Sequence, residues 1–205
     1  MGIRITRDIN NVDKVLQVLE QLQSKKMNIG ILSDSDELTL QKANAHEFGA
    51  HIVPKNSKYL TIPLGKEYAS QNARNVSGLS VYKSKNGNLF LVKNKWKENM
   101  EFCYFLANSI DIPERSFIRA GFDKNKNEIE DMVEQAIAET IEGQIDMETF
   151  YEKVGIYCVG KIQEYLIDLD SPPLSPLTLA NRQNGGSNPL VDTHQMNEQI
   201  SYKVV

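Results

Sequence analysis

The fold is decided by the apolar stretch Phe150-Tyr-Glu-Lys-Val-Gly-Ile-Tyr-Cys-Val-Gly-Lys-Ile-Gln-Glu-Tyr-Leu-Ile-Asp-Leu169. Its apolar side chains recur at three- and four-residue spacing, which is typical of a helix that packs along one broad stripe. The pattern predicts the longest helix of the chain over 147–169, beginning near Asp146. Gly155 and Gly160 lie inside it, where each costs a helix about 1 kcal/mol relative to alanine. We therefore expect a neighbouring backbone to approach closely at both glycines.

Shorter amphipathic patterns predict further helices on either side of this stretch. One helix is expected over 11–24 and another over 125–142, the second ending at Gly143. A short helix is expected at 40–48, closed by Gly49 in a left-handed conformation. Strands are expected at 2–6, 27–32 and 199–205.

The region 51–112 is rich in strand patterns. Asn86-Gly87 is a strong short-range hairpin signal, because a two-residue type I′ loop needs positive φ at both positions. Such a loop places Tyr82 opposite Leu91 and Val81 opposite Val92. The predicted strands of the meander are 79–84, 89–93 and 102–107.

These elements predict one α+β domain over 1–205, with helices packed on a mixed or antiparallel sheet. Because no linker sets residues 51–112 apart, we interpret them as a β-hairpin insertion within that domain. Two cysteines among apolar neighbours, Cys103 and Cys158, are expected to be buried thiols. The N-terminus lacks an apolar signal region and no apolar stretch approaches about 18 residues, so we expect a protein made inside a cell without a membrane span.

The formal net charge of −4 conceals an asymmetry along the chain. Residues 54–99 carry nine Lys or Arg against two Glu, whereas residues 123–153 carry ten Asp or Glu against three Lys. Solvated faces of a hairpin and a helix account for both runs. The alternative is attraction between copies, or between the basic surface and an acidic partner.

No set of residues predicts a catalytic, cofactor or metal site, so we expect no enzyme. His46 and His51 are five residues apart, which turns them away from each other on a helix, and Gly49 interrupts the pattern between them. Neither cysteine has the electropositive surroundings that activate a thiol. A hydrolase built from His46 or from surface carboxylates is the weakest alternative.

Three segments outside the helices have no catalytic form but a distinctive order. The first is Ala45-His-Glu-Phe-Gly49 and the second is Ile112-Pro-Glu-Arg-Ser-Phe-Ile-Arg119. The third, Ser171-Pro-Pro-Leu-Ser-Pro-Leu-Thr178, is followed by Asn188-Pro-Leu-Val-Asp-Thr193. Ser175 is a good N-cap before Pro176 at the first helical position, and Asp192 or Thr193 is expected to cap a later turn.

In this order and spacing, the three segments resemble the virion-morphogenesis (tail-completion or neck) proteins of long-tailed bacteriophages. The resemblance runs from Met27 to the C-terminus. Ser116 stands where the family often has proline, and His194 where it usually has glycine. The residues that carry the resemblance are His46, Glu47, Phe48, Gly49, Pro113, Arg115, Phe117, Pro172, Pro173, Leu174, Ser175, Pro176, Thr178, Pro189, Leu190, Asp192 and Thr193.

The resemblance implies a structural subunit without catalytic residues, which forms rings and sits at the end of the tail tube or between tail and head. Its implied partners are further copies of itself and tail-tube, tail-terminator or head-connector proteins. Its implied locations are the host bacterial cytoplasm during assembly and then the virion. We expect residues 171–193 to form a flexible assembly loop, and Phe48 and Phe117 to anchor loops on the subunit's own core. The rival function is a phage-encoded nucleic-acid-binding accessory protein that uses the basic region 54–99.

Overall fold

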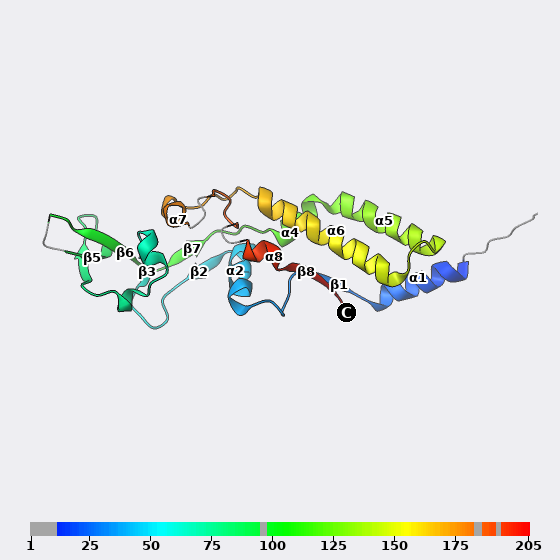
Figure 1. Ribbon diagram of the computed structural model, residues 1–205, viewed down its shortest axis with the longest axis horizontal. Coiled ribbons are helices and arrows are strands. Elements are labelled where there is room, and N and C mark those ends of the chain that lie inside the picture. Colours follow the sequence, from blue (N-terminus) through cyan, green and yellow to red (C-terminus); the bar gives the residue numbers. More distant parts are fainter. Residues whose placement is uncertain (1–11, 95–97, 183–185, 192–193) are drawn as a thin grey trace, which may run out of the picture.

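The computed structural model describes residues 12–94, 98–182, 186–191 and 194–205. Figure 1 shows an elongated molecule with a helical body at one end and a β-module at the other. A two-stranded ribbon joins the two parts. The chain is α+β and its sheets are antiparallel, as the sequence predicts.

The helical body is built around α6 (Met147–Asp168) and α5 (Lys126–Glu142), which lie side by side. Asp146 begins α6, because its carboxylate accepts a 2.8 Å hydrogen bond from the Thr149 backbone N–H. α5 ends at Gly143, as predicted, and Gly143 is in the left-handed conformation with φ 78°. Helix α1 (Val12–Ser24) packs against α5, and Tyr151 Oη donates to the Gln21 carbonyl.

A two-stranded sheet crosses one side of α6. β1 (Met27–Ile31) pairs antiparallel with β8 (Ile200–Val204), so a strand near the N-terminus meets the last strand of the chain. A Cβ built at Gly155 would lie 2.5 Å from two ring atoms of Tyr202 on β8, so a glycine is needed where helix and strand meet. A Cβ at Gly160 would meet nothing within 4 Å. The expected close approach is therefore wrong at Gly160, and at Gly155 the neighbour is an aromatic ring.

Helix α2 (Glu37–Phe48) leads into the ribbon. Gly49 has φ 71° but ψ 160°, so the predicted left-handed C-cap is wrong: the chain leaves the helix directly in an extended strand. That strand, β2 (Ala50–Ile52), pairs antiparallel with β7 (Ile110–Ile112). Residues 51–112 thus leave the body and return to it through this ribbon, and α4 (Ile118–Lys124) follows.

The β-module is a four-stranded antiparallel sheet in the order β3-β6-β5-β4. Its core gathers Tyr68, Cys103 and Tyr104 on one face of the sheet. Its elements are β3 (Leu60–Pro63), α3 (Lys66–Ala69), the 3₁₀ turn Ala73–Asn75, β4 (Ser80–Lys83), β5 (Leu89–Lys93) and β6 (Glu101–Ala107).

The β4–β5 hairpin exists, but its predicted register is wrong by one residue. Tyr82 faces Phe90 and Val81 faces Leu91. The Gly87 N–H donates to the Ser84 carbonyl at 3.0 Å, and the Ser84 N–H donates to the Asn88 carbonyl at 2.8 Å. The loop therefore has three residues with positive φ only at Gly87 (86°), which is the geometry of a type I turn followed by a left-handed glycine.

Two short helices complete the chain, α7 (Pro176–Asn181) and α8 (Gln195–Glu198). Ser175 caps α7 as predicted, with Pro176 in its first turn. His194 precedes α8 with φ 60° and makes no side-chain capping bond. The cap predicted at Asp192 or Thr193 and the strand predicted at 2–6 lie outside the described residues.

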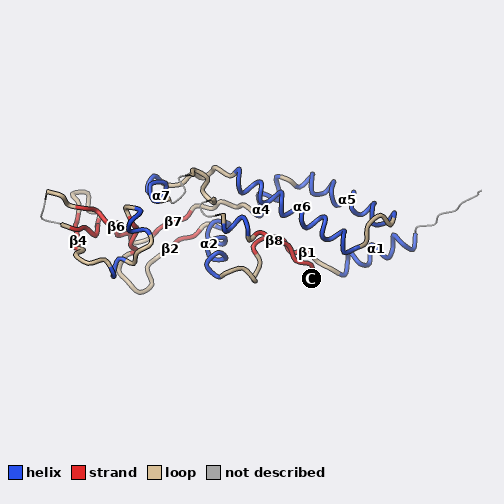
Figure 2. The backbone as a smooth tube through the Cα atoms, in the orientation of Figure 1, coloured by secondary structure: helices blue, strands red, loops and turns tan. Residues whose placement is uncertain are grey.

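Figure 2 shows the long helices at one end of the molecule and the four-stranded sheet at the other. Three hydrophobic clusters carry the packing. Phe117, Ile162 and Leu166, with at most 1% exposure, lie in the cluster that α6 shares with α8 and β8. Both cysteines are buried free thiols, as predicted. In the described part of the chain, no helix has the length and apolar character needed to cross a membrane.

Candidate assembly site where three segments meet

The three distinctive segments, far apart in sequence, meet between the helical body and the ribbon. The Arg115 backbone N–H donates to the His46 carbonyl at 2.7 Å, which joins the first segment to the second. Arg115 Nε donates to the Pro172 carbonyl at 2.7 Å and its Nη2 to the Pro173 carbonyl at 3.0 Å, which joins the second to the third. A buried arginine thus connects two irregular segments through backbone carbonyls alone.

Glu47 is the centre of the first contact. It is 4% exposed, and its carboxylate accepts hydrogen bonds from the backbone N–H groups of Phe117, Ile118 and Arg119 at 2.8–3.1 Å. The Ser116 hydroxyl donates to it at 2.8 Å and Arg119 Nε at 3.0 Å. A carboxylate from α2 therefore caps the first turn of α4, where Phe117 supplies no side-chain cap of its own.

The electrostatics of this contact follow from its hydrogen bonds. Burial alone would raise the pKa of Glu47, but the donors from Ile118, Arg119 and Ser116 outweigh it and hold that pKa below its ordinary value of 4.5. Glu47 is thus ionised at neutral pH. The same contact raises the pKa of Arg119, chiefly through its hydrogen bond with Glu47.

Phe48 does not pack inside the subunit, contrary to expectation. Its side chain is 61% exposed, and the Arg119 guanidinium lies over its ring at 4.6 Å. Arg119 Nη2 also donates to the Glu47 carbonyl at 2.6 Å and to Glu114 at 2.9 Å. Phe117, in contrast, is fully buried in the core, as predicted.

The described part of the 171–193 loop is anchored at several points. Buried Arg182 donates through Nη1 to the carbonyls of Gly186 and Asn188, each at 2.6 Å, and through Nη2 to that of Val191. Asn188 donates to the last carbonyls of α6 and accepts from two backbone N–H groups that follow it. Asn181 donates to the Pro63 carbonyl at 2.7 Å, so the loop also touches the β-module.

The predicted motif residues divide into buried and exposed sets. Pro189 and Leu190 are buried and Leu174 is half-buried, whereas Pro113, Pro173, Ser175, Pro176 and Thr178 are exposed. The important contacts that sequence reasoning missed are those of Ser116, Arg119, Asn181, Arg182 and Asn188. For Asn188 there was a signal, because an Asn before Pro favours a side-chain-capped turn. The sequence carries no signal for the contacts of Arg182, because an arginine within a polar stretch is expected to be exposed to solvent.

A small pocket of about 210 Å³ lies beside these segments, lined by residues that include His46, Lys42, Leu190 and His194. Burial, and then the charge of Arg115, lower the pKa of His46 to about 4, so the imidazole is neutral at pH 7. Its Nδ1 is buried and lacks a hydrogen-bond partner among the described residues. His51 lies on the ribbon, where its Nδ1 is 2.5 Å from Asp111 on the opposite strand.

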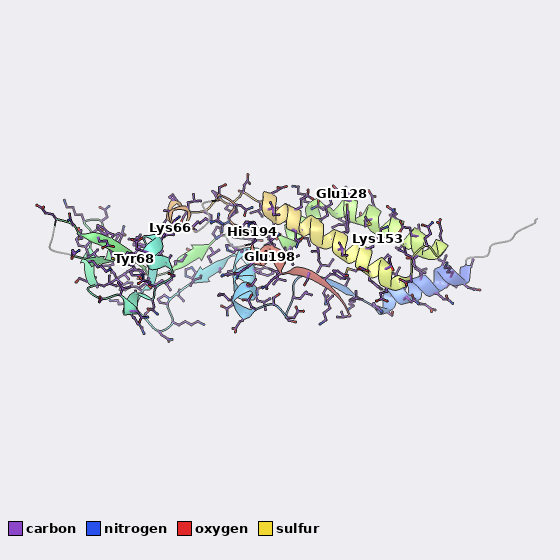
Figure 3. The ribbon with its side chains drawn as sticks, in the orientation of Figure 1. Lys66, Tyr68, Glu128, Lys153, His194 and Glu198 are labelled. Atoms are coloured by element: carbon purple, nitrogen blue, oxygen red, sulfur yellow. The ribbon has the colours of Figure 1, made fainter. Side chains whose placement is uncertain are left out.

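The other titratable side chains that lie close together form hydrogen bonds and ion pairs with one another. Figure 3 shows Tyr68 in the β-module, where it donates to Glu101 and accepts from Lys93 at 3.2 Å. Hydrogen bonds with Cys103 and Glu101, together with burial, raise the pKa of Tyr68, so the phenol stays protonated. On the helical body, Lys153 pairs with Glu139 at 2.7 Å and Lys161 with Glu128 at 2.5 Å. Within the described ranges, no three His, Cys, Asp or Glu side chains gather as a metal site.

Comparison with known proteins adds no relative: no family model, no curated protein and no solved structure matches this chain.

Proposed function

We propose that this chain is a structural subunit of a long-tailed phage or prophage particle, acting in tail completion or head–tail joining. It works by ring-type self-association and by docking to a tail-tube, tail-terminator or head-connector protein. The observation that carries the proposal is the meeting of its three family-like segments. The buried side chains of Glu47 and Arg115 bind backbone groups of the neighbouring segment, and Phe117 packs in the core.

Two surface features support association over chemistry. Exposed large apolar side chains occur on α1, α2, α4 and the β-module, with Phe48, Leu16 and Phe122 among them. The described part of the basic region, 54–94 and 98–99, and the acidic region 123–153 lie toward opposite ends of the elongated molecule (Figure 1). Opposite charge at the two ends favours contact between different ends of neighbouring copies.

Electron microscopy of particles assembled without this protein tests the proposal. We expect unjoined heads and tails, or tails of abnormal end structure, and restored particles when the intact chain is supplied. Normal infectious particles in its absence would show that the proposed role is wrong. The matched control is the Ile156→Asp variant, which changes an exposed residue of α6 outside the three segments and should restore particles fully.

The second candidate function is nucleic-acid binding by the β-module. The β-module carries Tyr82, Phe90 and Phe102, but their rings pack edge to face, at 87° between Tyr82 and Phe102 and 88° between Phe90 and Phe102. That geometry turns the rings toward each other instead of presenting flat faces to bases.

We therefore expect no saturable binding of duplex or single-stranded DNA at about 0.15 M salt, where non-specific electrostatic binding is weak. Fluorescence anisotropy over a salt series measures this. Saturable binding at this salt concentration would favour the second candidate if the slope of the log binding constant against log salt concentration became smaller on replacing both Lys83 and Lys85 with alanine. Replacing Lys126 and Lys153 on the helical body is the control for net charge alone.

A further inference from the structure

The β-module has a hydrophobic core of its own, separate from that of the helical body. Its cluster draws on described residues from 68 to 104, whereas the two clusters of the body contain no described residue between 50 and 112. Two parts of a chain that share no large apolar interface are expected to move relative to each other. Among the described residues, no shared hydrophobic cluster therefore fixes the orientation of the β-module.

The ribbon that joins the two parts is short and exposed. β2 and β7 form three residue pairs, and no residue of either strand is buried. Mostly exposed residues follow where the ribbon meets the β-module, in the stretch 53–59 on one side and at Asn108 and Ser109 on the other. A two-stranded ribbon alone is marginally stable, and a few residues at the ends of elements absorb the backbone rotations of a hinge. The junction formed by 53–59 and 108–109 thus has the form of a hinge.

A strap from the helical body reaches across this junction. Residues 170–182 follow the end of α6 and carry α7, which lies beside α3 of the β-module (Figure 1). At the end of α7, Asn181 Nδ2 donates to the Pro63 carbonyl of β3 at 2.7 Å. The strap is therefore a second connection between the two parts, in addition to the ribbon.

Both ends of the strap are fixed to the helical body. At its start, Arg115 donates to the carbonyls of Pro172 and Pro173. At its end, buried Arg182 donates to the Asn188 carbonyl, and the Asn188 side chain donates to the last carbonyls of α6. The strap is thus part of the body, and α7 is where it meets the β-module.

The contact of α7 with the β-module is small and incompletely satisfied. No residue of α7 is buried as a whole. The Asn181 amide donates to Pro63, but Asn181 Oδ1 is buried and has no hydrogen-bond partner among the described residues. A buried acceptor without a partner destabilises a contact by about as much as one neutral hydrogen bond stabilises it, or more. The two effects oppose each other, so the closed contact adds little net stability.

We propose that α7 is a releasable latch, and that the β-module turns about the junction formed by 53–59 and 108–109 when the latch opens. Opening breaks the hydrogen bond from Asn181 to Pro63 and exposes the whole Asn181 amide to water. The turn changes the angle between the basic β-module and the acidic helical body, and with it the surfaces that each end can reach. A partner that binds the open arrangement more tightly shifts the balance by its difference in affinity. The latch is a property of the fold and is independent of the proposed function.

Electron paramagnetic resonance distance measurements on the full chain test the latch. Spin labels are attached at Lys83→Cys on β4 and Ile156→Cys on α6, which are both exposed positions. The native Cys103 and Cys158 do not compete for label, because they are at most 2% exposed. Labelled chains are diluted with unlabelled protein, so that only distances within one molecule are measured. We expect one dominant, narrow distance from the closed arrangement and a minor population at other distances.

Asn181→Asp should open the latch. The substitution keeps the size of the side chain but places a carboxylate oxygen where the amide now donates to the Pro63 carbonyl. The ratio of closed to open molecules should therefore fall about tenfold or more. Ala180→Asp is the matched control, because it adds the same charge at an exposed position of α7 and should leave the ratio within about twofold.

Ser175→Ala weakens the latch without changing its contact atoms. It removes the side-chain oxygen that accepts from the Thr178 backbone N–H, so α7 loses its cap. The ratio of closed to open molecules should fall about fivefold, because loss of an N-cap destabilises a helix by roughly that factor.

Four results would overturn the proposal. The first is an unchanged distance distribution in Asn181→Asp, since the ribbon alone would then hold the β-module. The second is a broad distribution in the parent chain, and the third is an equal fall in Ala180→Asp. The fourth concerns a reference pair within the body, Leu16→Cys with Ile156→Cys, whose distance should be the same with and without Asn181→Asp. A change in that distance would mean that Asn181 stabilises the helical body itself.

Discussion

Replacing Glu47 with glutamine should lower the free energy of unfolding by about 3 kcal/mol, as measured by chemical denaturation. The substitution keeps the shape of the side chain but exchanges one carboxylate oxygen for an N–H donor. If the amide group takes the place of Oε2, it faces the backbone N–H groups of Phe117 and Ile118. If it takes the place of Oε1, it faces the Arg119 backbone N–H, Arg119 Nε and the Ser116 hydroxyl. The Phe117 N–H is buried, so water cannot replace the lost acceptor.

Glu114→Gln is the matched control, because Glu114 also binds Arg119 at 2.9 Å but on the surface, with a side chain 55% exposed. An exposed ion pair contributes at most about 1 kcal/mol. We therefore expect the control to change stability by less than that. Similar losses in the two variants would mean that Glu47 is merely one partner of a surface arginine and not the cap of α4.

The acid sensitivity of the protein should change with the same substitution. The pKa of Glu47 is lower in the folded chain than its ordinary 4.5, so its contribution is present above that value and is lost as pH falls through the folded pKa. The Glu47→Gln variant lacks this titration, and its stability should depend less steeply on pH below about 4.5. Parallel acid profiles for the two proteins would show that the carboxylate does not carry the pH dependence.

Local chemistry predicted three helix ends, whereas it failed for the C-cap at Gly49. Asp146 and Ser175 each offer a short side-chain oxygen to a backbone N–H three residues later, and both act as caps. Gly143 ends α5 because a glycine adopts positive φ without steric cost, which is also a local property. Such features need only a few neighbouring residues, so the sequence alone carries them.

The hairpin shows where local reasoning stops. The segment Lys85-Asn86-Gly87 fits a two-residue loop and a three-residue loop equally well. The pairing of β5 with β6, which shifts register between Leu91 and Val92, is a tertiary feature that the hairpin sequence does not contain. The loop has three residues instead of two, so the β4–β5 register differs by one residue from the prediction and both predicted cross-strand pairs are shifted.

The candidate site was predictable as a set of segments but not as a set of contacts. The three motifs were identified from order and spacing, yet their meeting depends on Glu47 reaching residues about 70 positions away. A glutamate near the end of a helix reads as solvated, and a phenylalanine beside it reads as buried. The structure reverses both, since Glu47 is 4% exposed and Phe48 is 61% exposed.

Two glycines of α6 should respond in opposite directions to the same substitution. Gly155→Ala should destabilise the protein by about 1–3 kcal/mol, because the new Cβ would lie 2.5 Å from the Cγ and Cδ2 atoms of the Tyr202 ring. Those atoms are at the base and side of the ring, and Tyr202 belongs to a strand paired with β1, so the ring cannot yield without moving β8.

Gly160→Ala is the matched variant, five residues along the same helix. A Cβ there meets nothing within 4 Å, and alanine removes the entropy cost of a glycine in a helix interior. We expect it to stabilise the protein by about 0.5–1 kcal/mol in the same denaturation experiment.

If Gly155→Ala also stabilised the protein, α6 and β8 would not be in the close contact described. If both variants lost stability, the open space beside Gly160 would be filled in the protein. Stability changes of opposite sign mean that the two glycines have different surroundings. Gly155 makes room for the Tyr202 ring, whereas Gly160 faces open space beside α6.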